Sequence, residues 1–136
     1  MLQTLKDKIE KSGTGNIKPV EADLTKPGFS FQNRFDTIYT SMTLHHIENT
    51  EEILHRFSSS MNLGGYLFIA DLLQEDGTFH GNGFKGHRGF DPEILKKIAR
   101  NAGFYSIETK TVYKIPKTLE NGTKKEFPVF FMSGRK

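Results

Sequence analysis

Histidine is the residue of this 136-residue chain best suited to proton transfer near neutral pH, and four histidines fall in two groups. His45 and His46 are adjacent, whereas His80 and His87 flank a glycine-rich stretch. A histidine in such a loop can take a proton from a hydroxyl or an amine. We therefore predict His80 and His87 as catalytic residues, with two exposed loop histidines of no chemical role as the competing interpretation.

A metal site at His45-His46 is not predicted. Adjacent loop residues rarely point the same way, and no carboxylate or third histidine stands at ligand spacing along the chain. The chain has no cysteines, which excludes disulfides and zinc-thiolate sites. One packed histidine and one histidine that lines a pocket is the arrangement we expect.

The clearest structural pattern lies around these first two histidines. Phe35–Thr40 and Tyr66–Asp71 are short apolar runs, typical of strands buried on both faces. A helix capped by Asn49 or Thr50 is predicted between them, so the strands should be parallel neighbours. Ligands bind beyond the carboxyl ends of such strands. The side chains expected there are Thr40, Ser41, Met42, His45, His46 and Asp71.

The rest of the chain predicts one α/β domain over residues 1–136. A helix over the first dozen residues precedes an edge strand, Ile17–Asp23, and Leu72–Gly89 is predicted to be a mobile loop. A helix then begins at Asp91-Pro92, with Ile94, Leu95, Ile98 and Ala102 facing inward. The end of the chain predicts an antiparallel hairpin, formed by Tyr105–Ile115, the turn pair Asn121-Gly122 and Phe127–Ser133.

Gly81–Gly86 matches the GxGxxG pattern of dinucleotide-binding loops. That motif has to follow a strand directly and open a helix, but here the flanking elements are predicted to end near Asp71 and to begin at Asp91. We therefore interpret the segment as a flexible lid. A nucleotide-binding domain, the rejected option, would require saturable nucleotide binding that is lost on Gly83→Val.

Composition narrows the class of protein. Hydrophobic residues make up 35% and charged residues 26%, as in globular domains. No apolar run reaches membrane-spanning length, and the charged N-terminal stretch differs from a signal peptide. The net charge of +3 is spread along the chain, so neither nucleic acid nor membrane is expected as a partner. A cytoplasmic location fits these features.

The order of these pieces resembles the C-terminal two-thirds of a class I methyltransferase that uses S-adenosyl-L-methionine (SAM), of the UbiE-like, small-molecule type. The resemblance rests on Val20–Leu24, on FDTIYTSMTLHHI from Phe35, on Leu63–Tyr66 and on Gly89–Asp91. It implies a Rossmann-like, mostly parallel sheet with a C-terminal antiparallel hairpin. The family order is 3-2-1-4-5-7-6, and this chain lacks the first two strands.

The resemblance also implies a reaction, direct displacement of the methyl group of SAM by a small-molecule acceptor. Asp23 would accept a hydrogen bond from the adenine amino group, Leu24 would pack on the adenine ring, and His45 would border the pocket. The methionine end of the cofactor would lie against Thr40, Ser41 and Met42.

The family's glycine-rich cofactor loop and ribose-binding acid have no counterpart in the chain. Met1 is therefore interpreted as an internal methionine of a longer reading frame, and impaired activity of the chain alone is expected. A non-catalytic remnant that binds protein is the alternative. The missing strands would expose a sheet edge, so either Ile17–Asp23 closes onto Phe35–Thr40 or two chains pair there as a homodimer.

Overall fold

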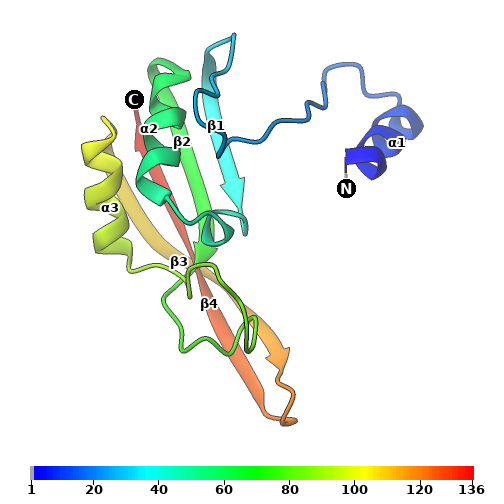
Figure 1. The fold of residues 1–136 in the computed structure, drawn as a ribbon, viewed down its shortest axis with the longest axis vertical. Helices are drawn as coiled ribbons and strands as arrows, with labels where there is room; N and C mark the ends of the chain where they lie inside the picture. The colour runs from blue at the N-terminus through cyan, green and yellow to red at the C-terminus, as the bar shows by residue number, and fades with distance from the viewer. Residues whose placement is uncertain (1) are drawn as a thin grey trace.

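The computed structural model describes residues 2–136 and contains one four-stranded sheet with two helices on one face (Figure 1). In chain order, the elements are α1 (Leu2–Ser12), β1 (Phe35–Ser41), the 3-10 turn η1 (Leu44–His46), α2 (Thr50–Ser59), β2 (Met61–Leu72), α3 (Pro92–Asn101), β3 (Tyr105–Thr118) and β4 (Lys124–Arg135).

The sheet order is β1-β2-β4-β3, in which β1 and β2 are parallel and the other two pairs are antiparallel. The predicted parallel neighbours and the C-terminal hairpin are therefore confirmed. The order also equals the last four places of the order 3-2-1-4-5-7-6 that the resemblance implied. The carboxyl ends of β1 and β2 lie at the same edge of the sheet, where the predicted site residues are found.

Two strand predictions are wrong, for one physical reason. Ile17–Asp23 forms no strand, and Ile17 and Val20 are 49% and 63% exposed. Phe35–Thr40 is not buried on both faces either, since Tyr39 is 79% exposed. A strand is held by its neighbours, and within residues 2–136 no strand pairs with the outer edge of β1. Closure of Ile17–Asp23 onto β1 therefore does not occur in this structure.

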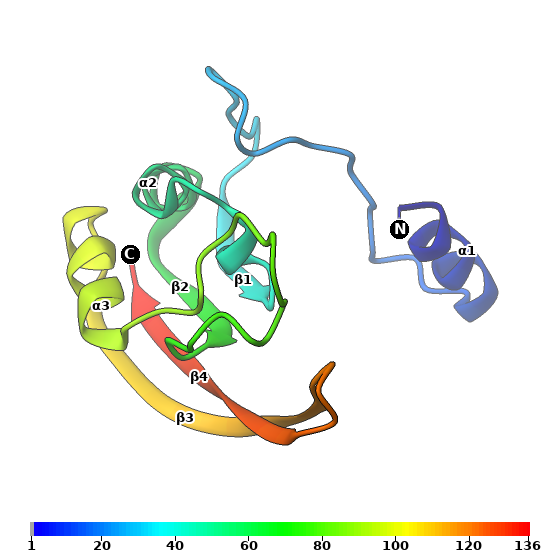
Figure 2. The same cartoon turned by 60° about the horizontal axis from the view of Figure 1, so that its bottom comes forward.

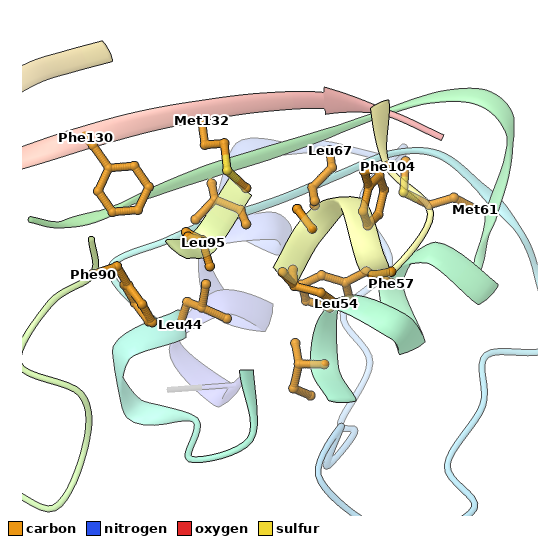
Figure 3. Close-up of a cluster of buried hydrophobic side chains, with 14 residues drawn as sticks. Leu44, Leu54, Phe57, Met61, Leu67, Phe90, Leu95, Phe104, Phe130 and Met132 are labelled. Atoms are coloured by element: carbon orange, nitrogen blue, oxygen red, sulfur yellow. The ribbon is translucent and has the colours of Figure 1, made fainter. Parts of the chain in front are cut away.

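The hydrophobic core lies between the sheet and the helices α2 and α3, which both cover the same face (Figures 2 and 3). Ile53, Leu54 and Phe57 of α2 are buried, as is Met61 at the start of β2. In α3 the prediction is partly wrong, because Ile94 is 57% exposed. The buried face of α3 is shifted to Leu95 and Ala99, which one helical turn brings together.

Gly64 and Gly65 lie inside β2 rather than at its start. The strand β2 runs from Met61 through both glycines, and the β1–β2 register shifts between Phe35 and Thr37. Gly64 has a positive φ of 81°, which a glycine adopts without strain. The irregularity lies at the end of β2 remote from the site.

The segment between β2 and α3 is tied down at its base. Backbone hydrogen bonds join Gln74 to Phe90 and Glu75 to Arg88, and Phe90 donates back to Leu72. These bonds hold the two ends of the segment together. Residues 76–87 therefore form a loop that lies over the carboxyl ends of β1 and β2 (Figure 2). The Gly81–Gly86 stretch lies within this loop, apart from both the strand before it and the helix after it.

The helix α1 lies apart from the sheet and its two helices (Figures 1 and 2). None of its described residues is buried, and Leu5 of its apolar stripe is 42% exposed. Among residues 2–136, no helix is both long enough and apolar enough to cross a membrane.

The start of α2 offers a test of its predicted cap. The Asn49 side chain accepts a hydrogen bond of 2.9 Å from the Glu52 amide, and the Glu52 carboxylate accepts one from Asn49 in return. We expect Asn49→Ala to lower the free energy of unfolding by about 1 kcal/mol, because a helix N-terminal amide loses its acceptor. Thermal denaturation measures the change. Asn33→Ala, at an exposed loop position, is the control, and an equal loss there would contradict the capping role.

Candidate active site

A buried carboxylate and a buried imidazole form the centre of the site. Asp71 is the next-to-last residue of β2 and is fully buried, and its Oδ1 lies 2.5 Å from His45 Nδ1. The same carboxylate accepts hydrogen bonds from the backbone amides of His45 and Leu72. A carboxylate with these donors acts only as an acceptor, so Nδ1 of His45 carries the proton. The ring of His45 is thereby fixed, with Nε2 directed away from Asp71.

His80, from the loop between β2 and α3, contacts Nε2 of His45. Its Nε2 lies 2.9 Å from His45 Nε2, and the ring of Phe84 stacks on His80 with a centroid distance of 3.9 Å. Partial desolvation lowers the pKa of His80, and the neighbouring imidazoles of His45 and His46 lower it further. A lowered pKa favours the neutral imidazole, the form that accepts a proton.

The structure contradicts one premise of the argument against a metal site, that adjacent loop residues point in different directions. The rings of His45 and His46 lie together, with centroids 4.2 Å apart, although these residues are adjacent in the chain. The third histidine that the sequence spacing did not supply is His80, whose ring centroid is 5.2 Å from that of His46. Closure of the loop after β2 brings it there.

His87 is placed differently from His80. Its Nε2 lies 3.0 Å from the carbonyl oxygens of both Ile47 and Glu48, and its backbone amide donates to the His45 carbonyl. A nitrogen that faces two carbonyl oxygens is satisfied as a donor. This geometry favours an anchoring role for His87, which holds the loop onto the segment that carries His45.

Two of the residues predicted to bind cofactor, Leu24 and Thr40, line one apolar groove. This groove, beside the outer edge of β1, has a volume of about 340 Å³. Ser41 and Met42 follow at the end of β1, where the Met42 amide donates to the Ala70 carbonyl. Met42 and Phe79 both pack against the small core formed by Leu72, Phe127 and Val129.

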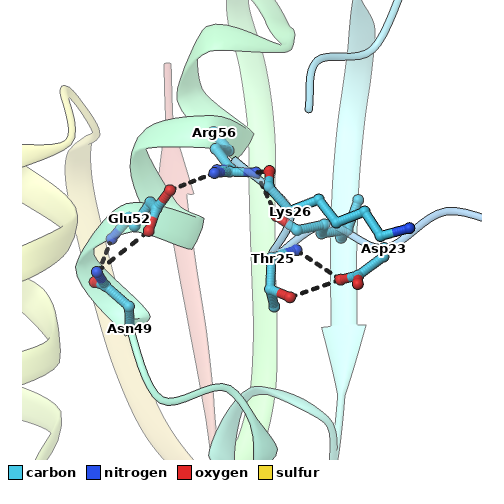
Figure 4. Close-up of polar contacts among 7 residues, drawn as sticks. Asp23, Thr25, Lys26, Asn49, Glu52 and Arg56 are labelled. Atoms are coloured by element: carbon cyan, nitrogen blue, oxygen red, sulfur yellow. Dashed lines mark hydrogen bonds and ion pairs between the residues drawn. The ribbon is translucent and has the colours of Figure 1, made fainter. Parts of the chain in front are cut away.

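Asp23 lies in an exposed turn that α2 holds in place (Figure 4). Its Oδ1 accepts hydrogen bonds from the Thr25 hydroxyl and amide, which lower the pKa of the carboxyl. Arg56 donates to the carbonyl oxygens of Leu24 and Lys26 and pairs with Glu52. Arg56 therefore holds the turn against α2, and the Asp23 carboxylate is engaged in hydrogen bonds within the turn itself.

A larger polar cavity of about 610 Å³ lies between the loop and the turn of the β3–β4 hairpin. His80 lines it on one side. The lining also includes charged side chains of both signs, namely Asp76, Arg88, Lys117 and Glu120. Lys125 pairs with Asp76 at 2.6 Å and so ties the loop to the hairpin. The cavity is suited to a small polar molecule.

The sequence places Asp71 at the ligand edge of the sheet without assigning it a role. The structure makes it the residue that orients His45. The available signal was its position, because an acid at the carboxyl end of β2 faces whatever follows β1. The pairing of His45 with His80 had no such signal, since it depends on the path of the intervening loop.

Comparison with known proteins agrees with this fold. A family model described as a methyltransferase domain matches residues 6–109. An uncharacterized methyltransferase of Schizosaccharomyces pombe is 33% identical over 87 residues, which cover 57% of this chain and 31% of that protein. The chain thus spans about a third of the length of this curated relative.

Solved structures share the fold at low identity. The BH2331 protein of Bacillus halodurans C-125 has a TM-score of 0.76 at 16% identity, over 99% of this chain and 78% of that one. Phosphoethanolamine N-methyltransferase 2 of Haemonchus contortus, solved in complex with SAM, has a TM-score of 0.55 at 16% identity, over 75% of this chain and 33% of that one.

Fold and site define a Rossmann-like domain whose ligand edge is formed by the ends of parallel strands. The chain belongs to the methyltransferase domain family. The family predicted from the sequence is thereby confirmed, together with SAM as the family's cofactor.

Proposed function

We propose that the chain supports SAM-dependent methyl transfer to a small polar acceptor. The observation that carries this proposal is the position of His80, which lines the polar cavity while its Nε2 meets the Asp71–His45 pair. When bound, SAM supplies a methyl group activated by the sulfonium. The residues of the chain contribute position and a site that excludes water, which can supply on the order of 7–11 kcal/mol at best.

The residues present fit part of the cofactor. The groove lined by Leu24 and Thr40 is apolar and has a volume of about 340 Å³, and Asp23 precedes Leu24 in the chain. In this proposal the groove takes the adenine ring, and Ser41 and Met42, which follow Thr40 at the end of β1, take the methionine portion. The glycine-rich loop and the ribose-binding acid of the family are contributed by no segment of this sequence, so the chain alone holds SAM incompletely.

His80 is the proton acceptor in this proposal. The acceptor molecule occupies the polar cavity and attacks the methyl group directly, without a covalent enzyme intermediate. If its nucleophilic atom carries a proton, that proton passes to Nδ1 of His80, because Nε2 of the same ring carries the hydrogen that it donates to His45 Nε2. The lowered pKa of His80 keeps this ring neutral before the transfer. His87 serves the site as the anchor of the loop rather than by touching the acceptor.

The groove can be tested by SAM binding. We expect Leu24→Asp to weaken SAM binding by about tenfold or more, since a carboxylate desolvated against an aromatic ring carries a penalty. Isothermal titration calorimetry on the purified chain measures the affinity. Val20→Asp, at an exposed position four residues earlier, is the matched control. Equal SAM affinity of Leu24→Asp and the parent chain would contradict the assignment.

A second candidate function is a non-catalytic module that pairs through the sheet edge. The observation that favours it is the outer edge of β1, which no strand of residues 2–136 covers and where Tyr39 is 79% exposed. A second copy that adds its own β1 there would give a homodimer. Light scattering at high concentration tests the homodimer, and a strict monomer would contradict it. Micromolar SAM binding by the chain, measured by calorimetry, would contradict a remnant that binds no cofactor.

A cytoplasmic location is part of the proposal and rests on composition, since the chain has no cysteines. Fractionation of cells that express the tagged native gene product tests it. Recovery in the membrane or secreted fraction would contradict this part of the proposal.

A further inference from the structure

Three imidazoles converge at the base of the loop. One nitrogen from each of His45, His46 and His80 lies within 4.8 Å of the other two, and this is the one group of potential metal ligands of its kind among residues 2–136. Two of them come from η1 and the third from the loop after β2, so loop closure assembles the group. The three histidines were not predicted to form one group, because His80 lies more than 30 residues after His45 and His46 in the sequence.

The buried member of the group is already arranged as a metal ligand. His45 is 1% exposed, and Asp71 occupies its Nδ1, which leaves the Nε2 lone pair directed at the other histidines. Histidines that bind metal commonly donate their second nitrogen to a carboxylate in this way, which fixes the ring and raises its basicity. A histidine that only filled core space would not require a fully buried carboxylate partner.

We propose that His45, His46 and His80 bind one Zn²⁺ ion, with a fourth coordination position open to water or to an atom of a bound molecule. Neutral imidazole is a good ligand for Zn²⁺, and three protein ligands leave a tetrahedral ion one free position. Adjacent ligand atoms around such an ion are about 3.3 Å apart for bonds of about 2.0 Å.

Assembly of the site needs only small movements of two exposed side chains. His46 can rotate toward the fixed ring of His45, and the distance of 2.9 Å between the Nε2 atoms of His80 and His45 has to widen slightly. The negative charge of Asp71, held at the opposite side of His45, offsets part of the charge of the ion. Phe84 covers the outer face of His80 and shields the site on that side.

The zinc proposal stands on geometry and goes beyond the proposed methyl transfer. The two compete for one lone pair, because a His80 nitrogen that ligates Zn²⁺ cannot accept a proton. Zinc binding therefore implies inhibition of any transfer that depends on His80. Metal binding is measured without SAM and without an acceptor, so its outcome is separate from the outcome for methyl transfer.

The test uses the untagged full chain titrated with Co²⁺, a spectroscopic substitute for Zn²⁺, followed by competition with Zn²⁺. We expect one ion per chain, the visible d–d bands of a four-coordinate site, and displacement by one equivalent of Zn²⁺. His46→Gln and His80→Gln should each weaken binding by about tenfold or more, whereas His55→Gln, an exposed histidine of α2, should not. Circular dichroism confirms that each variant is folded.

Two results would overturn the proposal. One is the absence of metal binding by the folded parent chain at a large excess of Co²⁺ and of Zn²⁺. The other is an equal loss of affinity in His55→Gln and His80→Gln, which would mean that the ion binds to surface histidines at random.

Discussion

Asp71→Ala is expected to lower the free energy of unfolding by about 3 kcal/mol or more, because it leaves three buried hydrogen-bond donors without an acceptor. Asp71 is fully buried, and its carboxylate accepts from His45 Nδ1 and from the amides of His45 and Leu72. Alanine offers none of these three donors an acceptor, and each unsatisfied buried donor costs about 1–3 kcal/mol. Urea denaturation monitored by circular dichroism measures the change.

Asp36→Ala is the matched control for this prediction. Asp36 also lies in a strand, but its carboxylate is exposed and accepts a hydrogen bond from Asn62 at the surface. Its loss should amount to less than about 1.5 kcal/mol. If Asp71→Ala were no more destabilising than Asp36→Ala, Asp71 would not be the buried partner of His45, and both the proton-acceptor and the zinc proposals would lose their support.

Elements with strong local signals were predictable. The cap at Asn49, the Asp91-Pro92 helix start and the Asn121-Gly122 turn each depend on a few adjacent residues, and the structure contains all three. The parallel pairing of β1 and β2 was predictable as well, because a helix between two strands leaves little choice of direction. The prediction of a strand at Ile17–Asp23 was wrong, because such a pattern of residues forms a strand only beside a partner strand.

Prediction of the site was limited by the loop. The position of Met42, His45 and Asp71 at one sheet edge follows from topology alone. The contact of His80 with His45 spans 35 residues and depends on the backbone bonds that close residues 74–90. No periodicity in the sequence indicates those bonds, so His80 and His87 looked equivalent. In the structure His80 lines the cavity, whereas His87 faces backbone carbonyl oxygens.

The contact between the loop and η1 gives the second large expected effect. Gly86 lies directly against the His45 carbonyl, which accepts a hydrogen bond of 2.7 Å from the His87 amide. A Cβ at position 86 would collide with that carbonyl oxygen, which is backbone and cannot rotate away. Gly86→Ala should therefore push the loop from η1, at a cost of about 1–3 kcal/mol in the free energy of unfolding.

The same displacement should separate His80 from His45, so Gly86→Ala is expected to weaken Co²⁺ binding by about tenfold or more, although residue 86 contributes no ligand. Gly15→Ala is the control, since a Cβ there meets nothing within 4 Å and φ is not positive. That change should be neutral or stabilise the fold by up to about 1 kcal/mol. Equal stability of Gly86→Ala and Gly15→Ala would show that the loop does not rest on His45, and the three histidines would then have no reason to converge.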